Sequence, residues 1–560
     1  MNNLLPVALL AVAAFAPAQA PTAPAPERPR LVVLCSVDQL ACWVFEQARP
    51  HFAADGGFRR LLDQGTWFTQ CAYEHACTET GPGHATIGTG APASGHGIVR
   101  NEWWSPEARA KVYCVAEAVE ALPDLREGRN RGPGRMLLPT LGDSLKAHVA
   151  GSKVASVSWK DRAAILMAGR SADAVVWFEP STGNLVTNTT WTATTPAWLT
   201  EFNGKRAIDG YHGYVWDRFG PADAYAGLVD DRPYELPHQN GSNQRTLPQP
   251  LTGGKPDPDV GFYAEVYGSP VGNTLIRLAA EAALQGMELG QDPVPDLLCV
   301  SFSSTDVVGH YFGPDSVEAR DTLLRLDREL ATLLSFLDRT VGAGRYAFFL
   351  TADHGVGPTP EWARAHGVDA GRGALLKNAR AAAEKALTNA YGAPPSGSRW
   401  FAHVGECTFF FDQDVLQAAR GERDAATMSR EAARIAAAAA ASTAGIHAAY
   451  ATEDLLAGDA SGDPLRRALV RALCPGRAGE VQLVLRPYWL DGMTPASHGT
   501  PYPYDREVPA LALGPGVPAG VHLAAPITPG FGVVLFAAML GIPRPAGAVD
   551  DLPAGLLGAR

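Results

Sequence analysis

Residues Leu31–Val37 read LVVLCSV, and Asp38 follows them directly. A continuous apolar run of this length is typical of a parallel strand that is buried on both faces of its sheet. Comparable runs occur at Lys153–Trp159, Pro295–Phe302 and Tyr346–Leu350, with helix-like segments between them. This alternation predicts an α/β fold whose core is a doubly wound, mostly parallel sheet flanked by helices, with insertions.

Three of these runs lead into carboxylates. Asp38 ends the first run, Asp306 and His310 follow the third, and Asp353 and His354 follow the last. Open α/β sheets bind their ligands at the carboxyl ends of the strands. On a helix, the i, i+4 spacing puts Asp306 and His310 on one face, which suits two ligands of one metal ion. Taken singly, each carboxylate is equally compatible with a helix cap or a turn.

The stretch Cys77–Asn101 reads CTETGPGHATIGTGAPASGHGIVRN. Thr80 precedes Pro82 and Gly83, where the strand-like run Gly65–Tyr73 gives way to a helix start. Proline is tolerated in a first helical turn, and the open N–H groups there favour an anion. The pattern indicates a nucleophile or a phosphate contact at a helix N-terminus. The alternative is a threonine cap followed by a Gly/Pro turn.

The run Lys153–Trp159 continues into Lys160, Asp161 and Arg162. In an extended segment, residues i and i+2 share a face, so we expect Lys160 and Arg162 to project together and Asp161 to point away. Two cations at a strand end would form a phosphate clamp, and arginine can bind phosphate bidentately. The alternative is an ordinary solvated charge cluster.

The candidate residues combine three carboxylates, three imidazoles and one hydroxyl, a set that suits two Zn²⁺ ions with oxygen and nitrogen ligands. They are Asp38, Thr80, Asp306, His310, Asp353, His354 and His498. The motifs T-x-P-G-H-A-T-x-x-T-G, S-T-D-x-x-G-H, T-A-D-H-G and S-H-G-T resemble those of the alkaline phosphatase superfamily. With Asn101 and the Lys160/Arg162 pair, the chain is most similar to phosphate-irrepressible, PafA-type bacterial alkaline phosphatases.

This resemblance implies a role for each candidate residue. One zinc ion would be held by Asp306, His310 and His498. The other would be held by Asp38, Asp353 and His354, and it would activate Thr80 as the nucleophile. Asn101, Lys160 and Arg162 would contact the phosphoryl oxygens. His84 is expected to support the loop rather than bind metal, because the six ligand places are filled from other segments.

The function expected from the resemblance is hydrolysis of small phosphate monoesters through a phosphothreonine intermediate. A phosphodiesterase or nucleotide pyrophosphatase on the same metal core is the alternative, with Trp103, Trp104 and Trp159 as an apolar surface for the second ester group. A non-catalytic metal- or phosphate-binding protein is a further alternative. A sulfatase is disfavoured because the nucleophile segment lacks a Cys/Ser-x-Pro-x-Arg pattern.

The composition argues against one class of partner, and the N-terminal residues predict the compartment. The 560 residues are 46% apolar and carry a net charge of −11 without a Lys/Arg block, which argues against nucleic acid as a partner. Residues 1–20 read MNNLLPVALLAVAAFAPAQA and match a signal peptide rather than a stable membrane anchor, so we expect a periplasmic or secreted protein.

The expected organisation is a single alkaline phosphatase-like domain over residues 21–560. Two insertions are expected within it, an irregular or β-rich one at 171–256 and a helical one at 361–480. The sequence leaves the oligomeric state open.

Overall fold

The computed structural model describes residues 27–125 and 127–557, so the predicted signal peptide lies outside the described residues. Its centre is a nine-stranded sheet in the order β19-β2-β18-β11-β1-β10-β5-β6-β7. In chain order these strands are β1 (Leu31–Val37), β2 (Thr66–Cys71), β5 (Val154–Ser158), β6 (Ala174–Glu179), β7 (Asn184–Val186), β10 (Asp296–Phe302), β11 (Tyr346–Thr351), β18 (Ala510–Leu513) and β19 (Val521–Ile527).

Strand β1 occupies the middle of the sheet, and all of its residues are buried. It pairs in parallel with β10 and β11, with Leu31 opposite Asp296 and Tyr346. Strands β5 and β6 continue the parallel arrangement, whereas β18 and β7 are antiparallel to their neighbours. The predicted α/β fold with a mostly parallel sheet is confirmed, and the ends of β1, β10 and β11 meet at one edge.

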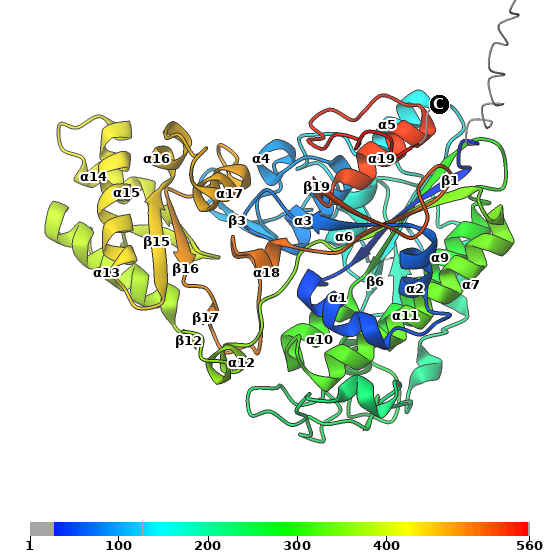
Figure 1. The fold of residues 1–560 in the computed structure, drawn as a ribbon. Helices are drawn as coiled ribbons and strands as arrows, with labels where there is room; N and C mark the ends of the chain where they lie inside the picture. The colour runs from blue at the N-terminus through cyan, green and yellow to red at the C-terminus, as the bar shows by residue number, and fades with distance from the viewer. Residues whose placement is uncertain (1–26, 126, 558–560) are drawn as a thin grey trace, which may run out of the picture.

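Helices cover both faces of this sheet (Figure 1). One group packs together and consists of α3 (Thr80–Thr89), α5 (Leu141–His148), α6 (Asp161–Ala168) and α19 (Phe531–Leu540). The other group consists of α1 (Cys42–Ala48), α2 (Gly57–Gln64), α9 (Val271–Gly286), α10 (Ser304–Phe312) and α11 (Val317–Leu337). Within the described part of the chain, no helix combines the length and apolar character needed to cross a bilayer.

A second lobe lies beside the core, at the left of Figure 1. Its antiparallel sheet has the order β13-β14-β16-β15, formed by β13 (Phe401–Gly405), β14 (Thr408–Phe411), β15 (Ile446–Ala451) and β16 (Val481–Leu485). Helices α13 (Leu375–Tyr391) and α15 (Ala425–Ala441) share a separate apolar core with this sheet. The lobe therefore contains a sheet as well as helices, while the division into one domain with two insertions stays a prediction.

One local prediction is wrong. Asp161 and Arg162 are not extended, because β5 ends at Ser158 and α6 begins at Asp161. The buried run Ala163–Ala168 packs as a helix, and an acidic residue such as Asp161 is favoured in a first helical turn. Further along the chain, α8 (Val260–Tyr267) and α9 are separate helices, since Gly268 and Pro270 interrupt the helical run.

Candidate active site

The strand ends of the central sheet bring three carboxylates together. Asp38 follows β1, Asp306 lies in the first turn of α10 after β10, and Asp353 follows β11. Asp38 and Asp353 have no solvent exposure, and Asp306 is only 5% exposed. Because β1 lies between β10 and β11 and all three strands are parallel, the topology alone places these acids side by side at the carboxyl-terminal ends of the strands.

Three histidines face these carboxylates in a consistent orientation. The Nδ1 atoms of His310, His354 and His498 lie 2.9, 3.0 and 2.7 Å from the carbonyl oxygens of Ala496, Gly355 and Thr78. A carbonyl can only accept, so each Nδ1 carries the proton and donates it. The Nε2 lone pairs are then left free to bind a metal ion.

Two groups of these side chains could each hold a metal ion. They are Asp306, His310 and His498, and Asp38, Asp306 and His354, with ligand atoms within 4.8 Å of one another in each group. Asp38 Oδ1, Asp353 Oδ2 and His354 Nε2 are buried and have no hydrogen-bond partner among the described residues. Unpaired buried polar atoms are costly, and bound cations would satisfy them. The residues present therefore fit a metal centre.

Asp353 lies next to the second of these groups. The second group contains Asp306 where the resemblance implied Asp353. Asp353 lies beside that group, with its Oδ2 atom 3.5 Å from His354 Nε2 and 3.2 Å from His84 Nδ1. Its role as a direct ligand stays a prediction.

The two predicted cations reach Thr80 from the start of α6. Lys160 Nζ lies 3.3 Å from Thr80 Oγ1, and Arg162 Nη2 lies 3.4 Å from the same atom. Lys160 Nζ also donates to Asp38 Oδ2 at 2.6 Å and to Asp306 Oδ2 at 2.7 Å. Burial opposes the charged form of Lys160, but Asp306 and Asp38 outweigh it and hold the pKa of the amine above its ordinary value. Lys160 is therefore charged in this site.

Thr80 is the first residue of α3, with Glu79 at the N-cap position, and it is 1% exposed. Asn101 is fixed against the same helix start. Its Oδ1 atom accepts from the Gly81 N–H at 2.7 Å, and its own N–H donates to Glu79 Oε2 at 2.8 Å. Arg100 Nη1 donates to Glu79 Oε1 at 2.7 Å. Glu79 thus positions Asn101 at the start of α3, the helix whose first residue is Thr80.

Known proteins share the sequence pattern of this chain. The model of the family described as type I phosphodiesterase / nucleotide pyrophosphatase matches residues 32–459. The chain belongs to this family. It is 30% identical to alkaline phosphatase PhoV of Synechococcus elongatus, over 95% of this chain and 93% of that protein. It is also 30% identical to alkaline phosphatase PafA of Elizabethkingia meningoseptica, over 88% of each.

A crystal structure of alkaline phosphatase PafA shares the fold. It matches with a TM-score of 0.86 and 28% identity, covering 95% of this chain and 99% of that one. These relatives confirm the resemblance to the alkaline phosphatase superfamily. The strands and helix that carry these motifs thus belong to a fold shared with alkaline phosphatase PafA.

One member of the site, Gln39, was not identified from the sequence. Gln39 has a left-handed backbone (φ 66°), and it donates from its N–H to Asp353 Oδ1 at 3.1 Å and from Nε2 to Asp306 Oδ1 at 2.7 Å. His84 is buried between Thr80 O and Ser301 Oγ, each 2.8 Å from its ring. Gln39 directly follows Asp38 at a strand end, and that position was its only sequence signal.

Proposed function

We propose that the chain is a phosphoesterase that hydrolyses small phosphate monoesters through a phosphothreonine intermediate at a two-zinc site. The observation that carries this proposal is the approach of both Lys160 Nζ and Arg162 Nη2 to Thr80 Oγ1. A monoester bears one more anionic oxygen than a diester, and two cations beside the nucleophile can stabilise that additional negative charge. Several relatives are named alkaline phosphatases, which supports the same class.

The residues of the chain would have separate roles in the reaction. Zn²⁺ held by the two ligand groups would favour the alkoxide of Thr80 and stabilise the oxygen of the departing alcohol. Thr80 Oγ forms a bond to phosphorus while the bond to the ester oxygen breaks, and that electron pair leaves with the alcohol. Water then hydrolyses the phosphothreonine. Lys160, Arg162 and Asn101 offset the charge on the non-bridging oxygens.

A phosphodiesterase or nucleotide pyrophosphatase is the second candidate, because the family model carries that description. The aromatic surface expected for its second ester group is incomplete. Trp159 is 4% exposed and stacks on Tyr267, with ring centroids 4.7 Å apart, inside the core. This packing leaves its face unavailable to a ligand.

The first prediction separates the two candidates. We expect a larger kcat/KM for phenyl phosphate than for its methyl diester, measured after chelation and restoration of Zn²⁺. Lys160→Ala and Arg162→Ala should lower kcat/KM for the monoester by roughly 100-fold or more and should affect the diester less. Arg170→Ala is a matched control, because Arg170 is exposed and pairs with Glu117 instead.

A preference for the diester that these substitutions leave unchanged would favour the second candidate. Zinc-loaded protein that hydrolyses no phosphate or sulfate ester would favour a non-catalytic binding protein instead. We further propose export to the periplasm or the medium, on the basis of residues 1–20. Phosphatase activity confined to the cytosolic fraction of the producing cells would contradict export.

A further inference from the structure

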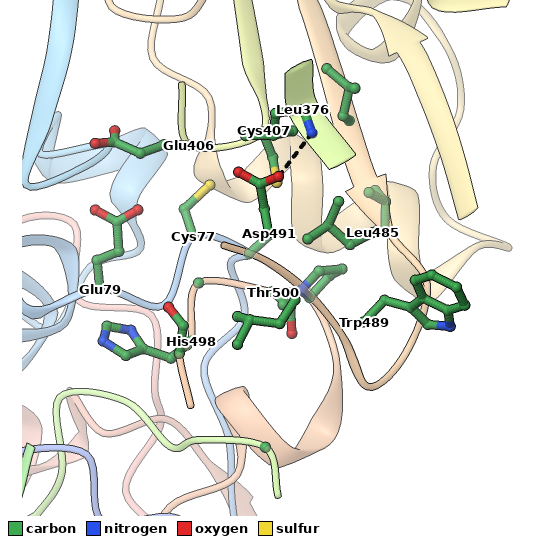
Figure 2. A pocket seen from close by; sticks show the side chains of 18 of the residues that line it. Cys77, Glu79, Leu376, Glu406, Cys407, Leu485, Trp489, Asp491, His498 and Thr500 are labelled. Atoms are coloured by element: carbon green, nitrogen blue, oxygen red, sulfur yellow. Dashed lines mark hydrogen bonds between the residues drawn. The ribbon is translucent and has the colours of Figure 1, made fainter. Parts of the chain in front are cut away.

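A cavity of about 380 Å³ opens between the core and the second lobe, beside the candidate active site (Figure 2). Glu79, Asn101 and His498 contribute to its lining from the site. From the side of the second lobe it is lined by Glu406, Cys407, Gln482, Asp491 and Trp489, among others. The cavity thus shares Asn101 with the predicted phosphoryl contacts and His498 with one of the two metal groups.

This position suits the alcohol portion of a bound ester. Asn101 lies at the start of α3 beside Thr80, where the phosphoryl group would be held, and His498 belongs to the metal group that does not include Asp38. Neither Lys160 nor Arg162 lines the cavity. The space therefore extends from the phosphate site away from the two clamp cations, and its volume is sufficient for a small organic group.

The charged side chains that line the cavity are mostly acidic. Its lining includes the carboxylates of Glu79, Glu406 and Asp491 and one guanidinium, Arg100, which pairs with Glu79 at 2.7 Å. Asp491 accepts the Leu376 N–H through Oδ1 at 3.0 Å, as Figure 2 shows. Within residues 27–125 and 127–557, neither Glu406 nor Asp491 has a cationic partner within ion-pair distance. Burial, reinforced by Glu79, raises the pKa of Glu406 to about 7, so two carboxylates are available to a ligand above that pH.

The backbone of Glu406 lies in a strained turn. Gly405 pairs with Thr408 across β13 and β14, so Glu406 and Cys407 form a two-residue hairpin turn. Both have positive φ, 50° and 58°, in a turn that normally takes asparagine and glycine. Residues held in such backbone conformations cluster at functional sites. Glu406 lines the cavity together with Glu79 and Arg100, and it is close enough to interact electrostatically with both.

We propose that this cavity receives the alcohol portion of the ester, and that Glu406 and Asp491 make it selective for alcohols bearing an ammonium group. The proposal rests on the proposed phosphomonoesterase function. An ammonium group next to two unpaired carboxylates is stabilised by Coulomb attraction, whereas an anionic alcohol is repelled. Phosphate monoesters of amino alcohols are therefore the favoured substrate class, and esters of hydroxy acids are disfavoured.

The test uses three phosphate monoesters of similar size, the 2-aminoethyl, propyl and carboxymethyl esters. At low ionic strength and a pH above 7, where Glu406 is ionised and the amine is still protonated, kcat/KM should be largest for the aminoethyl ester and smallest for the carboxymethyl ester. Glu406→Gln and Asp491→Asn should each lower the aminoethyl-to-carboxymethyl ratio by about fivefold. The control is Glu422→Gln, an exposed carboxylate outside the cavity, which should leave the ratio unchanged.

Glu406→Lys provides an independent check, because reversing the charge should turn the preference toward the carboxymethyl ester. A ratio that stays the same in all three cavity variants would overturn the proposal, as would a wild-type preference for the carboxymethyl ester. Phenyl phosphate is measured in parallel. Hydrolysis of phenyl phosphate with an unchanged ratio refutes only the selectivity, whereas no hydrolysis by the wild type refutes the phosphomonoesterase function itself.

Discussion

Thr80 is the residue on which the proposed chemistry depends most directly. Its hydroxyl is buried, and Lys160 and Arg162 both approach it. We predict that Thr80→Ala lowers kcat for phenyl phosphate by at least about 1000-fold, because the substitution removes the hydroxyl on which the proposed covalent intermediate forms. Thr80→Ser should retain part of the activity.

A matched control for this prediction lies on the same helix. Thr89 is also buried, and its hydroxyl donates to the Ala85 carbonyl oxygen at 2.6 Å. Thr89→Ser should leave kcat near the wild-type value. Isolation of a phosphorylated peptide from acid-quenched enzyme would locate the intermediate, and phosphate on any residue other than Thr80 would contradict the assignment.

Glu318 gives a pH prediction at the same scale. It is fully buried, and neither carboxylate oxygen has a hydrogen-bond partner among the described residues. Burial, reinforced by Asp230, raises the pKa of Glu318 to about 8. Between its ordinary pKa and about 8, the folded chain retains a proton that the unfolded chain has released. The free energy of unfolding should therefore decrease as the pH rises through this window.

Glu318→Gln should remove this contribution, so Tm should fall less steeply toward pH 8 than in the wild type. The measurement is thermal unfolding across that range of pH, and exposed Glu422→Gln is the control. Identical slopes for the wild type and Glu318→Gln would show that the carboxyl does not titrate with the predicted pKa.

Among the secondary-structure elements, helix α3 is held against the end of β11 by a glycine. A Cβ atom added at Gly83 would overlap the backbone carbonyl of Asp353. Alanine normally stabilises a helix interior relative to glycine, but overpacking of this kind costs about 1–3 kcal/mol. Because Thr80 and Asp353 lie on the two elements that would separate, Gly83→Ala should lower both Tm and kcat.

The comparison variant is Gly95→Ala in α4 (Ala93–His96). An added Cβ there would lie 3.4 Å from the Ala91 Cβ, an ordinary van der Waals distance. It should leave kcat unchanged. Wild-type kcat in Gly83→Ala would mean that the spacing between α3 and β11 does not set the geometry of the site.

Element prediction from the sequence succeeded where a continuous apolar run marked the element. The apolar run Leu31–Val37 became β1 with the same bounds, because all of its residues are buried. It failed at Lys160–Arg162, where charged residues carry no periodic signal and the helix is decided by the residues that follow. The orientation of Gln39 depends on a left-handed backbone, which sequence patterns do not reveal.

On the scale of the whole molecule, the site assembles segments that are far apart in the chain, and only tertiary structure brings them together. The strand-end rule was sufficient to predict that Asp38, Asp306 and Asp353 meet. It could not predict which carboxylate shares which metal group, because that depends on side-chain distances of a few ångströms. It also gave no sign of the cavity, since the cavity needs the hairpin of the second lobe to approach the start of α3.

The last prediction concerns the coupling of metal binding to the stability of the whole fold. Asp38, Asp306 and Asp353 are buried together, and burial and the neighbouring Asp353 raise the pKa of Asp38 because a further negative charge there is unfavourable. Lys160 offsets only part of this repulsion. Zn²⁺ should therefore bind the folded chain far more tightly than the unfolded chain. At a free concentration of 1000 times Kd it should add about 4 kcal/mol to the free energy of unfolding.

We expect chelation to lower Tm and to abolish phosphatase activity, and Zn²⁺ to restore both. In the variant His310→Ala/His498→Ala, which removes ligands from one group only, Zn²⁺ should raise Tm by a smaller amount. Asp491→Asn serves as a control, because its carboxylate belongs to neither metal group. If Zn²⁺ raised the Tm of the double variant as much as that of the wild type, the ion that stabilises the fold would not be held by His310 and His498, and the stabilisation would have to come from the group of Asp38, Asp306 and His354.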